Sequence, residues 1–160
     1  EWIRAKSAQQ TKCRAQKPTR SFEPGETFPL LGEPTKPPVH TRTKIIEWYK
    51  MKATDHLKKR THQLAKKLEE ITGRQVQPRA IKIRSYRSRW GTCHRDNSIT
   101  YNWKVVMASP EIVDYLIAHE LTHILHKNHG PNFKKTLALM DPEYKKNQKW
   151  LRSNGARLDV

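Results

Sequence analysis

The sequence predicts an α+β domain with a small, mainly antiparallel sheet, a long backing helix and an irregular N-terminal extension. Three observations lead to this prediction. A long stretch with apolar residues at helical spacing is followed by three short stretches typical of strands, and capped helical segments occupy the last third. The 160 residues suit one domain with an extension, which we place at residues 41–160 and 1–40 respectively.

The extension is rich in proline, which helix interiors do not tolerate. Residues 1–40 contain six of the ten prolines. We expect residues 22–32 to form a short hairpin around Pro24 and Gly25, because a Pro-Gly pair favours a turn. The remainder is predicted to be irregular, either as an arm on the domain or as part of a truncated β-region.

Residues 43–72 are predicted to form the long helix. Apolar residues recur near a period of 3.6, and the lysines lie mostly away from them. The apolar stripe consists of Ile45, Tyr49, Leu57, Leu64, Leu68 and Ile71. Gly73 follows as a residue typical of a helix end. This helix therefore has one face with which to back a sheet.

Three strands are predicted next. Residues 80–86 alternate apolar and polar side chains, and residues 89–94 and 98–106 flank an Arg-Asp-Asn turn. We expect the strand 98–106 to be an open edge of the sheet, where an extended peptide could pair. Tyr101 and Asn102 on this strand are therefore candidate substrate-binding residues.

Capping signals place three more helices after the strands. Ser109 as N-cap and Pro110 at the first position begin a helix that should end near residues 128–130. A helix over residues 131–140 and another over about 141–152 follow.

The chain is strongly basic. Lys and Arg total 32 against 15 Asp and Glu, which gives a formal net charge of +17. Residues 74–104 contain eight basic residues and a single acid, Asp96. Such a surface attracts anions, so nucleic acid or a nucleotide is a candidate partner through this stretch.

Other features bear on class and compartment. No apolar run approaches the roughly 18 residues of a membrane span, so no membrane partner is expected. The first residues are mixed and charged, unlike a secretory signal. Two cysteines, Cys13 and Cys93, cannot make a disulfide framework, and a reducing, cytoplasmic location is the expectation.

The helix that begins after Ser109 contains the motif His119-Glu-Leu-Thr-His123. Residues four apart project from one helix face, so both imidazoles can reach one ion. Zinc accepts two imidazoles, keeps a position open for water and lowers the pKa of that water to about 7. Glu120 stands beside the first ligand, where its carboxylate can take a proton from the zinc-bound water. The motif therefore predicts a zinc-dependent hydrolase with Glu120 as general base.

A third metal ligand is expected after this helix. Asn128 and Gly130 permit a turn that swings His129 back toward the metal. His126 lies on the same helix face as the first two histidines, but three ligands in line along a straight helix converge poorly on one ion. We favour His129, with His126 and Glu143 as alternatives.

Four longer segments carry a resemblance to a known family. They are Ser88-Arg-Trp-Gly-Thr-Cys93, Ile99-Thr-Tyr-Asn-Trp103, the run from His119 to Gly130 with Phe133, and Asp141-Pro-Glu-Tyr-Lys145 with Trp150-Leu151. Over roughly residues 43–155 the chain resembles the YgjP-like metal-dependent hydrolases, which are zincin-type metallopeptidase-like proteins. The spacing of the metal motif is also similar to that of SprT/WLM-type proteases.

This resemblance implies a zincin-like catalytic domain in which the second helix is the active-site helix. It implies zinc ligation by His119, His123 and His129 and general-base catalysis by Glu120. Tyr144 is a candidate donor to a developing oxyanion, although packing at a helix start is the other role open to it.

Three functions are compatible with these features. A zinc metallopeptidase that acts on a peptide or protein comes first, because the chain lacks a Gly-rich phosphate loop. The second is a metal-dependent hydrolase of a non-peptide substrate such as a nucleotide phosphoanhydride, with residues 74–104 clamping the phosphates. The third is a nucleic-acid-associated module with an accessory metal site.

Overall fold

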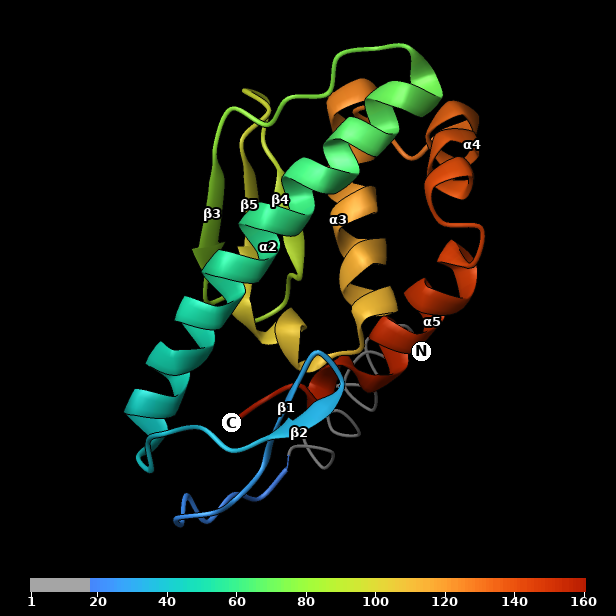
Figure 1. Ribbon diagram of the computed structural model, residues 1–160. Helices are drawn as coiled ribbons and strands as arrows, with labels where there is room; N and C mark the ends of the chain where they lie inside the picture. The colour runs from blue at the N-terminus through green and yellow to red at the C-terminus, as the bar shows by residue number, and fades with distance from the viewer. Residues whose placement is uncertain (1–17) are drawn as a thin grey trace.

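A three-stranded sheet and a bundle of helices form the body of the protein, seen in a computed structural model that describes residues 18–160 (Figure 1). The strands β3 (Ile81–Arg84), β4 (Gly91–Cys93) and β5 (Ile99–Asn102) follow the order β3-β5-β4. β5 runs antiparallel to β4 and parallel to β3. The predicted α+β class is confirmed, and Cys13 and the first part of the extension lie outside the described residues.

The prediction of an open sheet edge at residues 98–106 is wrong. β5 is the central strand, and all four of its residues are buried between neighbours on both sides. The strand also ends earlier, because the Asn102 side chain accepts a hydrogen bond from the Lys104 backbone N–H and starts the 3-10 helix η1 (Trp103–Met107). The free edges of the sheet belong to β3 and β4.

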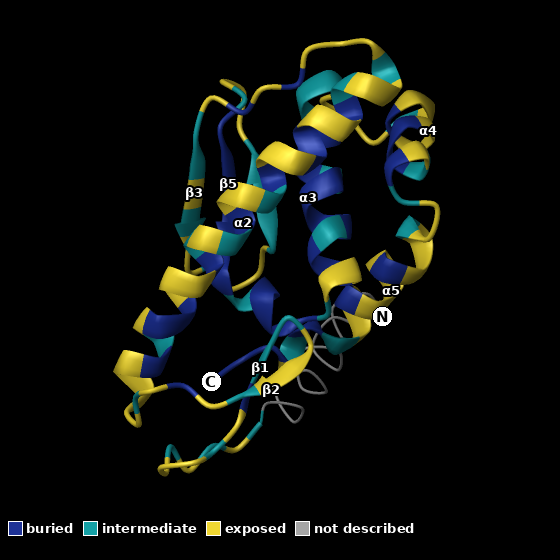
Figure 2. Ribbon diagram, in the orientation of Figure 1, coloured by how far each residue is buried: buried dark blue, intermediate teal, exposed yellow. Residues whose placement is uncertain are grey.

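The long helix α2 (Arg42–Thr72) lies close to the predicted range. Thr41 caps its start by accepting from the Lys44 N–H, and Gly73 ends it in the left-handed conformation at φ 65°. Figure 2 shows the buried stripe that α2 turns toward the sheet and the neighbouring helix. Ile71, predicted to belong to this stripe, is exposed because it lies on the last turn.

Helix α3 (Pro110–Leu125) is the centre of the helical layer. It packs against α2, β4, α4 (Pro131–Met140) and α5 (Tyr144–Asn154), and its middle is buried on nearly every side (Figures 1 and 2). α3 ends a few residues before the predicted 128–130. Its C-cap, His126, has extended backbone angles, so the chain turns away there.

A two-stranded hairpin of β1 (Phe28–Leu30) and β2 (Glu33–Thr35) packs on the end of the domain. It reverses at Leu31 and Gly32, both at positive φ. The predicted turn at Pro24 and Gly25 is present, with the Glu26 N–H donating to the Glu23 carbonyl at 3.1 Å, but the paired strands of the hairpin do not flank it, so the predicted centre of the hairpin is wrong. The Leu31 N–H donates to the Val106 carbonyl at 2.6 Å, and the Tyr49 hydroxyl donates to the Pro29 carbonyl at 2.7 Å. The hairpin is therefore joined to η1 and α2.

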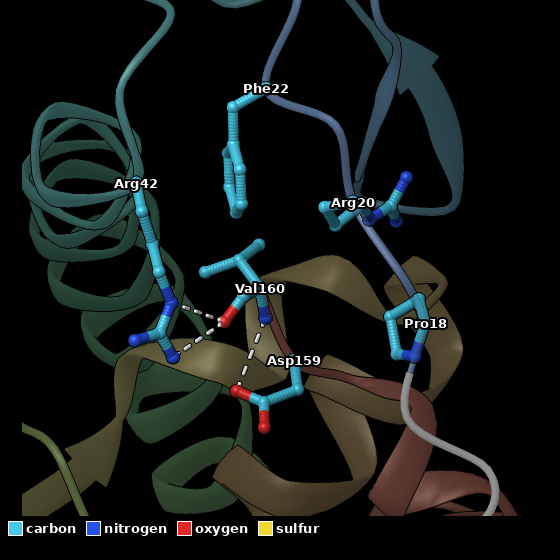
Figure 3. A pocket seen from close by; sticks show the side chains of 6 residues that line it. All are labelled: Pro18, Arg20, Phe22, Arg42, Asp159 and Val160. Carbon is cyan, nitrogen blue, oxygen red and sulfur yellow. Dashed lines mark hydrogen bonds between the residues drawn. The ribbon is translucent and has the colours of Figure 1, made fainter.

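The last residues of the described chain, including η2 (Gly155–Arg157), return to the start of α2. Arg42 donates from Nε and Nη2 to the Val160 carbonyl at 3.1 and 3.0 Å (Figure 3). Asp159 forms an ion pair with Lys104 of η1. Pro18, Arg20 and Phe22 line the other side of the shallow pocket at this point (Figure 3). None of the helices in residues 18–160 is both long enough and apolar enough to cross a membrane.

Replacement of Phe28 by alanine tests whether the hairpin is part of the cooperative fold. The Phe28 side chain is 1% exposed, so its loss should lower the free energy of unfolding by about 3–5 kcal/mol. Urea denaturation measures this change. Leu139→Ala, at a side chain that is 55% exposed, is the control and should change it by less than about 0.5 kcal/mol. Equal effects of the two substitutions would contradict the docking of the hairpin.

Candidate metal centre

Three histidines bring their ring nitrogens together beside α3. The Nε2 atom of His129 lies 3.1 Å from Nε2 of His123 and 3.2 Å from Nε2 of His119. The three ligand atoms all lie within 4.8 Å of one another. The structure therefore brings together the three residues that the sequence predicted as ligands, and no other His, Cys, Asp or Glu of residues 18–160 joins this group.

Two features of the chain produce this convergence. His119 and His123 stand one turn apart on α3, and the break in the helix at His126 lets the following loop return His129 to them. The Asn128 carboxamide oxygen accepts from the Gly130 N–H at 3.2 Å and stabilises the loop before α4. The Phe133 ring, with its centroid 4.6–5.0 Å from those of the three imidazoles, forms an apolar wall behind the cluster.

His126 supports the cluster without joining it. Its backbone carbonyl lies 3.1 Å from Nδ1 of His123, so that Nδ1–H donates to it and Nε2 is left unprotonated toward the centre. Its own ring contacts the Thr136 hydroxyl of α4 at 3.1 Å. The alternative Glu143 also lies elsewhere, at the start of α5, where it pairs with Lys146.

The cluster fits a cation. Three imidazole nitrogens with lone pairs face one another, and the mutual contact is unfavourable unless a positive ion lies between them. Burial, reinforced by His123 and His129, lowers the pKa of His119 to about 4, and burial also lowers the pKa of His123. Both rings are therefore neutral at pH 7, the state in which imidazole binds a metal.

Glu120 lies on the side of α3 that faces the sheet. Its side chain is 5% exposed and sits against strand β4, whose Cys93 backbone N–H donates to the carboxylate. Burial raises the pKa of Glu120 to about 7, and the Cys93 N–H partly offsets this by favouring the charged form. A carboxyl group that titrates near neutral pH beside a metal cluster is suited to take up and release protons.

The position of Glu120 depends on a glycine in β4. A Cβ atom on Gly91 would lie 2.5 Å from Oε1 and 2.8 Å from Cγ of Glu120, far inside van der Waals contact. Only glycine lets the strand come this close to the carboxylate. Gly91 was not among the site residues predicted from the sequence, although a glycine within a short strand is a signal of close approach.

The two residues predicted to bind substrate are buried and form hydrogen bonds inside the protein. Tyr101 is fully buried, and its hydroxyl contacts the Thr61 hydroxyl at 3.2 Å. The Asn102 carboxamide donates to the carbonyls of Tyr86 and Arg89, both at 3.0 Å. The edge location on which their assignment rested is wrong, because β5 is the central strand. Tyr144 is half-buried against the core at the first residue of α5, and its role as an oxyanion donor stays a prediction.

Metal titration of two histidine variants distinguishes a ligand from its support. His129→Ala should lower the affinity for Zn²⁺ by more than about 100-fold, because a ring nitrogen of the cluster is removed. His126→Ala should lower it by only about tenfold, because the backbone carbonyl that orients His123 is retained. Calorimetric titration of both variants measures this. A larger loss of Zn²⁺ affinity in His126→Ala than in His129→Ala would exclude His129 as the third ligand.

The raised pKa of Glu120 predicts how the stability of the metal-free protein depends on pH. The unfolded chain loses this proton near pH 4.5 and the folded chain near pH 7, so stability falls as the pH rises between these values. Between pH 5 and 8 wild type should lose about 2–3 kcal/mol relative to Glu120→Gln. Chemical denaturation of both proteins at each pH measures the difference. If the difference in unfolding free energy between wild type and Glu120→Gln is the same at pH 5 and pH 8, the carboxyl group is not desolvated.

A comparison against protein families identifies the family to which the chain belongs. The model of the YgjP-like metallopeptidase domain matches residues 34–154. Searches of curated proteins and of solved structures gave no match. The matched range begins within β2 and ends with α5, so it includes the whole metal centre. The family implies a metal-dependent hydrolase, and the chain belongs to the YgjP-like metallopeptidase family.

Proposed function

We propose that the protein is a zinc-dependent peptidase in which Glu120 is the general base. The observation that carries this proposal is the position of the Glu120 carboxylate. Glu120 follows His119 of the metal cluster on α3, and its carboxylate lies against β4. Membership of a metallopeptidase family supports it. The three imidazoles are a ligand set that zinc prefers in catalytic sites.

Zinc held by His119, His123 and His129 would supply Lewis-acid chemistry, polarising a carbonyl and acidifying water. Glu120 takes the proton from the attacking water and afterwards delivers it to the departing amine. A pKa near neutrality suits both transfers, since the carboxyl group must be a base in one step and an acid in the next. The Cys93 N–H keeps the carboxylate oriented through this cycle.

The outer edge of β4 is the place where an extended peptide would pair. The Asn102 N–H donates to the Trp90 carbonyl, and the His94 N–H donates to the Ser98 carbonyl. The backbone groups of Trp90 and His94, on either side of β4, therefore point toward β5. In an antiparallel pair the intervening residues, Gly91 and Cys93, turn their backbone groups the other way. One of these outward groups, the Cys93 N–H, donates to the Glu120 carboxylate, so a peptide that pairs with the remaining groups of this edge would lie beside the base.

Cleavage of a peptide library by the zinc-loaded protein tests the proposed activity. Zinc-loaded Glu120→Gln is the blank, because it lacks the base and keeps the three histidines. Cuts that depend on Glu120 are the expected result and would define the sequence preference. If zinc is bound and no peptide is cut, the peptidase proposal is wrong, and nucleoside triphosphates become the next substrates to assay.

Gly91→Ala should separate catalysis from metal binding. The added Cβ must push the Glu120 carboxylate aside, so kcat for peptide cleavage should fall by about 100-fold or more. Zinc content should be unchanged, since the three atoms nearest to the added Cβ all belong to Glu120 and none to a histidine. Thr92→Ala is the control on the same strand, on the face shared with Thr100, and should keep most of the activity. Full activity of Gly91→Ala would show that the position of Glu120 does not limit the rate.

A further inference from the structure

Four exposed cations form a surface that the metal centre does not use. Lys82 and Arg84 lie on β3, at the free edge of the sheet, and Arg87 and Arg89 follow in the connection to β4. We call these four residues the basic edge. We propose that the basic edge binds the phosphate backbone of nucleic acid.

The side chains of β3 are divided between two faces. Ile81 and Ile83 pack against the core cluster, while Lys82 and Arg84 are exposed and, because side chains alternate along a strand, lie on the opposite face. The strand register places Lys82 beside Thr100 and Arg84 beside Asn102. Both cations therefore project from the face of the sheet that is turned away from the α2 side.

The connection after β3 is held in place, so that its two arginines continue the same surface. The Asn102 carboxamide donates to the Tyr86 and Arg89 carbonyls, and the Trp103 indole N–H donates to the Ser85 hydroxyl at 2.9 Å. Because Arg84 is the register neighbour of Asn102, the segment that carries Arg87 and Arg89 is fixed next to it. The four cations thus stand on one pre-formed scaffold.

The charge of the basic edge is not neutralised within the described residues. The Arg79 side chain pairs with Asp96, and Lys104 pairs with Asp159. Asp96, the single acid of residues 74–104, also accepts hydrogen bonds from the Ser98 N–H and hydroxyl. Across residues 18–160 no ion pair involves a member of the basic edge. Four uncompensated cations in one place favour a polyanionic partner.

Protection of an open sheet edge accounts for only half of this pattern. Charged side chains on an edge strand prevent pairing with other chains, and Lys82 and Arg84 would serve that purpose. Arg87 and Arg89 lie outside the strand, where there is no edge to protect. Arginine is also the residue whose planar fork fits phosphate oxygens, whereas the exposed cations along α2 are mostly lysines.

Nucleic acid suits this surface better than a lipid membrane. Surfaces that insert into membranes combine cations with exposed apolar side chains. The large exposed hydrophobic residues of the described chain, Met51, Ile71, Leu139 and Trp150, lie on α2, α4 and α5, and the basic edge has none. The surface is also distinct from the metal centre, so its test does not require peptidase activity.

Binding of a fluorescent 30-nucleotide single-stranded DNA to the full chain, measured by anisotropy across a range of salt concentrations, tests the proposal. The test variant replaces the basic edge by glutamine, as K82Q/R84Q/R87Q/R89Q. The control removes the same charge from exposed lysines of α2 and α4, as K66Q/K67Q/K134Q/K135Q. The end of α2 and α4 lie away from β3 in Figure 1. Circular dichroism verifies that both variants are folded.

The test variant should bind at least tenfold more weakly at about 0.1 M salt, and the slope of log K against log salt should become shallower by about 3. The control should keep the affinity within about threefold. An equal loss in the control would mean that binding follows net charge alone, and the proposal would be overturned. Failure of wild type to bind DNA, or tighter binding to vesicles that contain phosphatidylglycerol, would overturn it as well.

Discussion

The close contact between strand β4 and the Glu120 side chain is the constraint on which the site depends. Gly91 has no Cβ, and this lets the edge strand approach the carboxylate and donate the Cys93 N–H to it. The same contact excludes water, which raises the pKa of Glu120 toward neutrality. One missing methyl group therefore sets the position, the orientation and the proton affinity of the proposed base.

Helix α3 joins this constraint to the rest of the molecule. Its apolar residues fill the space between α2, β4 and the last two helices, while one polar side presents two histidines to the solvent boundary. The helix must end at His126 so that His129 can return, and the His126 carbonyl at this break also orients His123. Stability and metal binding thus depend on the same helix, so a substitution in α3 that alters the packing also alters the position of the histidines.

Local patterns of the sequence predicted much of this arrangement. The 3.6-residue stripe of α2, the Pro110 start of α3 and the spacing of His119 and His123 depend on neighbouring residues, and the structure contains all three features. Strand order does not depend on neighbours along the chain, and the prediction that placed Tyr101 and Asn102 on an edge was wrong for that reason. The hairpin reversal at Leu31 was missed because tertiary contacts to Val106 and Tyr49 hold it there. The contact of Gly91 with Glu120 joins distant segments, and only the folded chain shows it.

X-ray absorption spectroscopy of the zinc-loaded protein at the zinc edge tests the central claim most directly. The account predicts three imidazole nitrogens and one oxygen at about 2.0–2.2 Å from the metal, with no sulfur. The His129→Ala protein should then lose one imidazole contribution from the spectrum. A sulfur at about 2.3 Å, supplied by one of the two cysteines, or only two imidazoles in the wild type would contradict it.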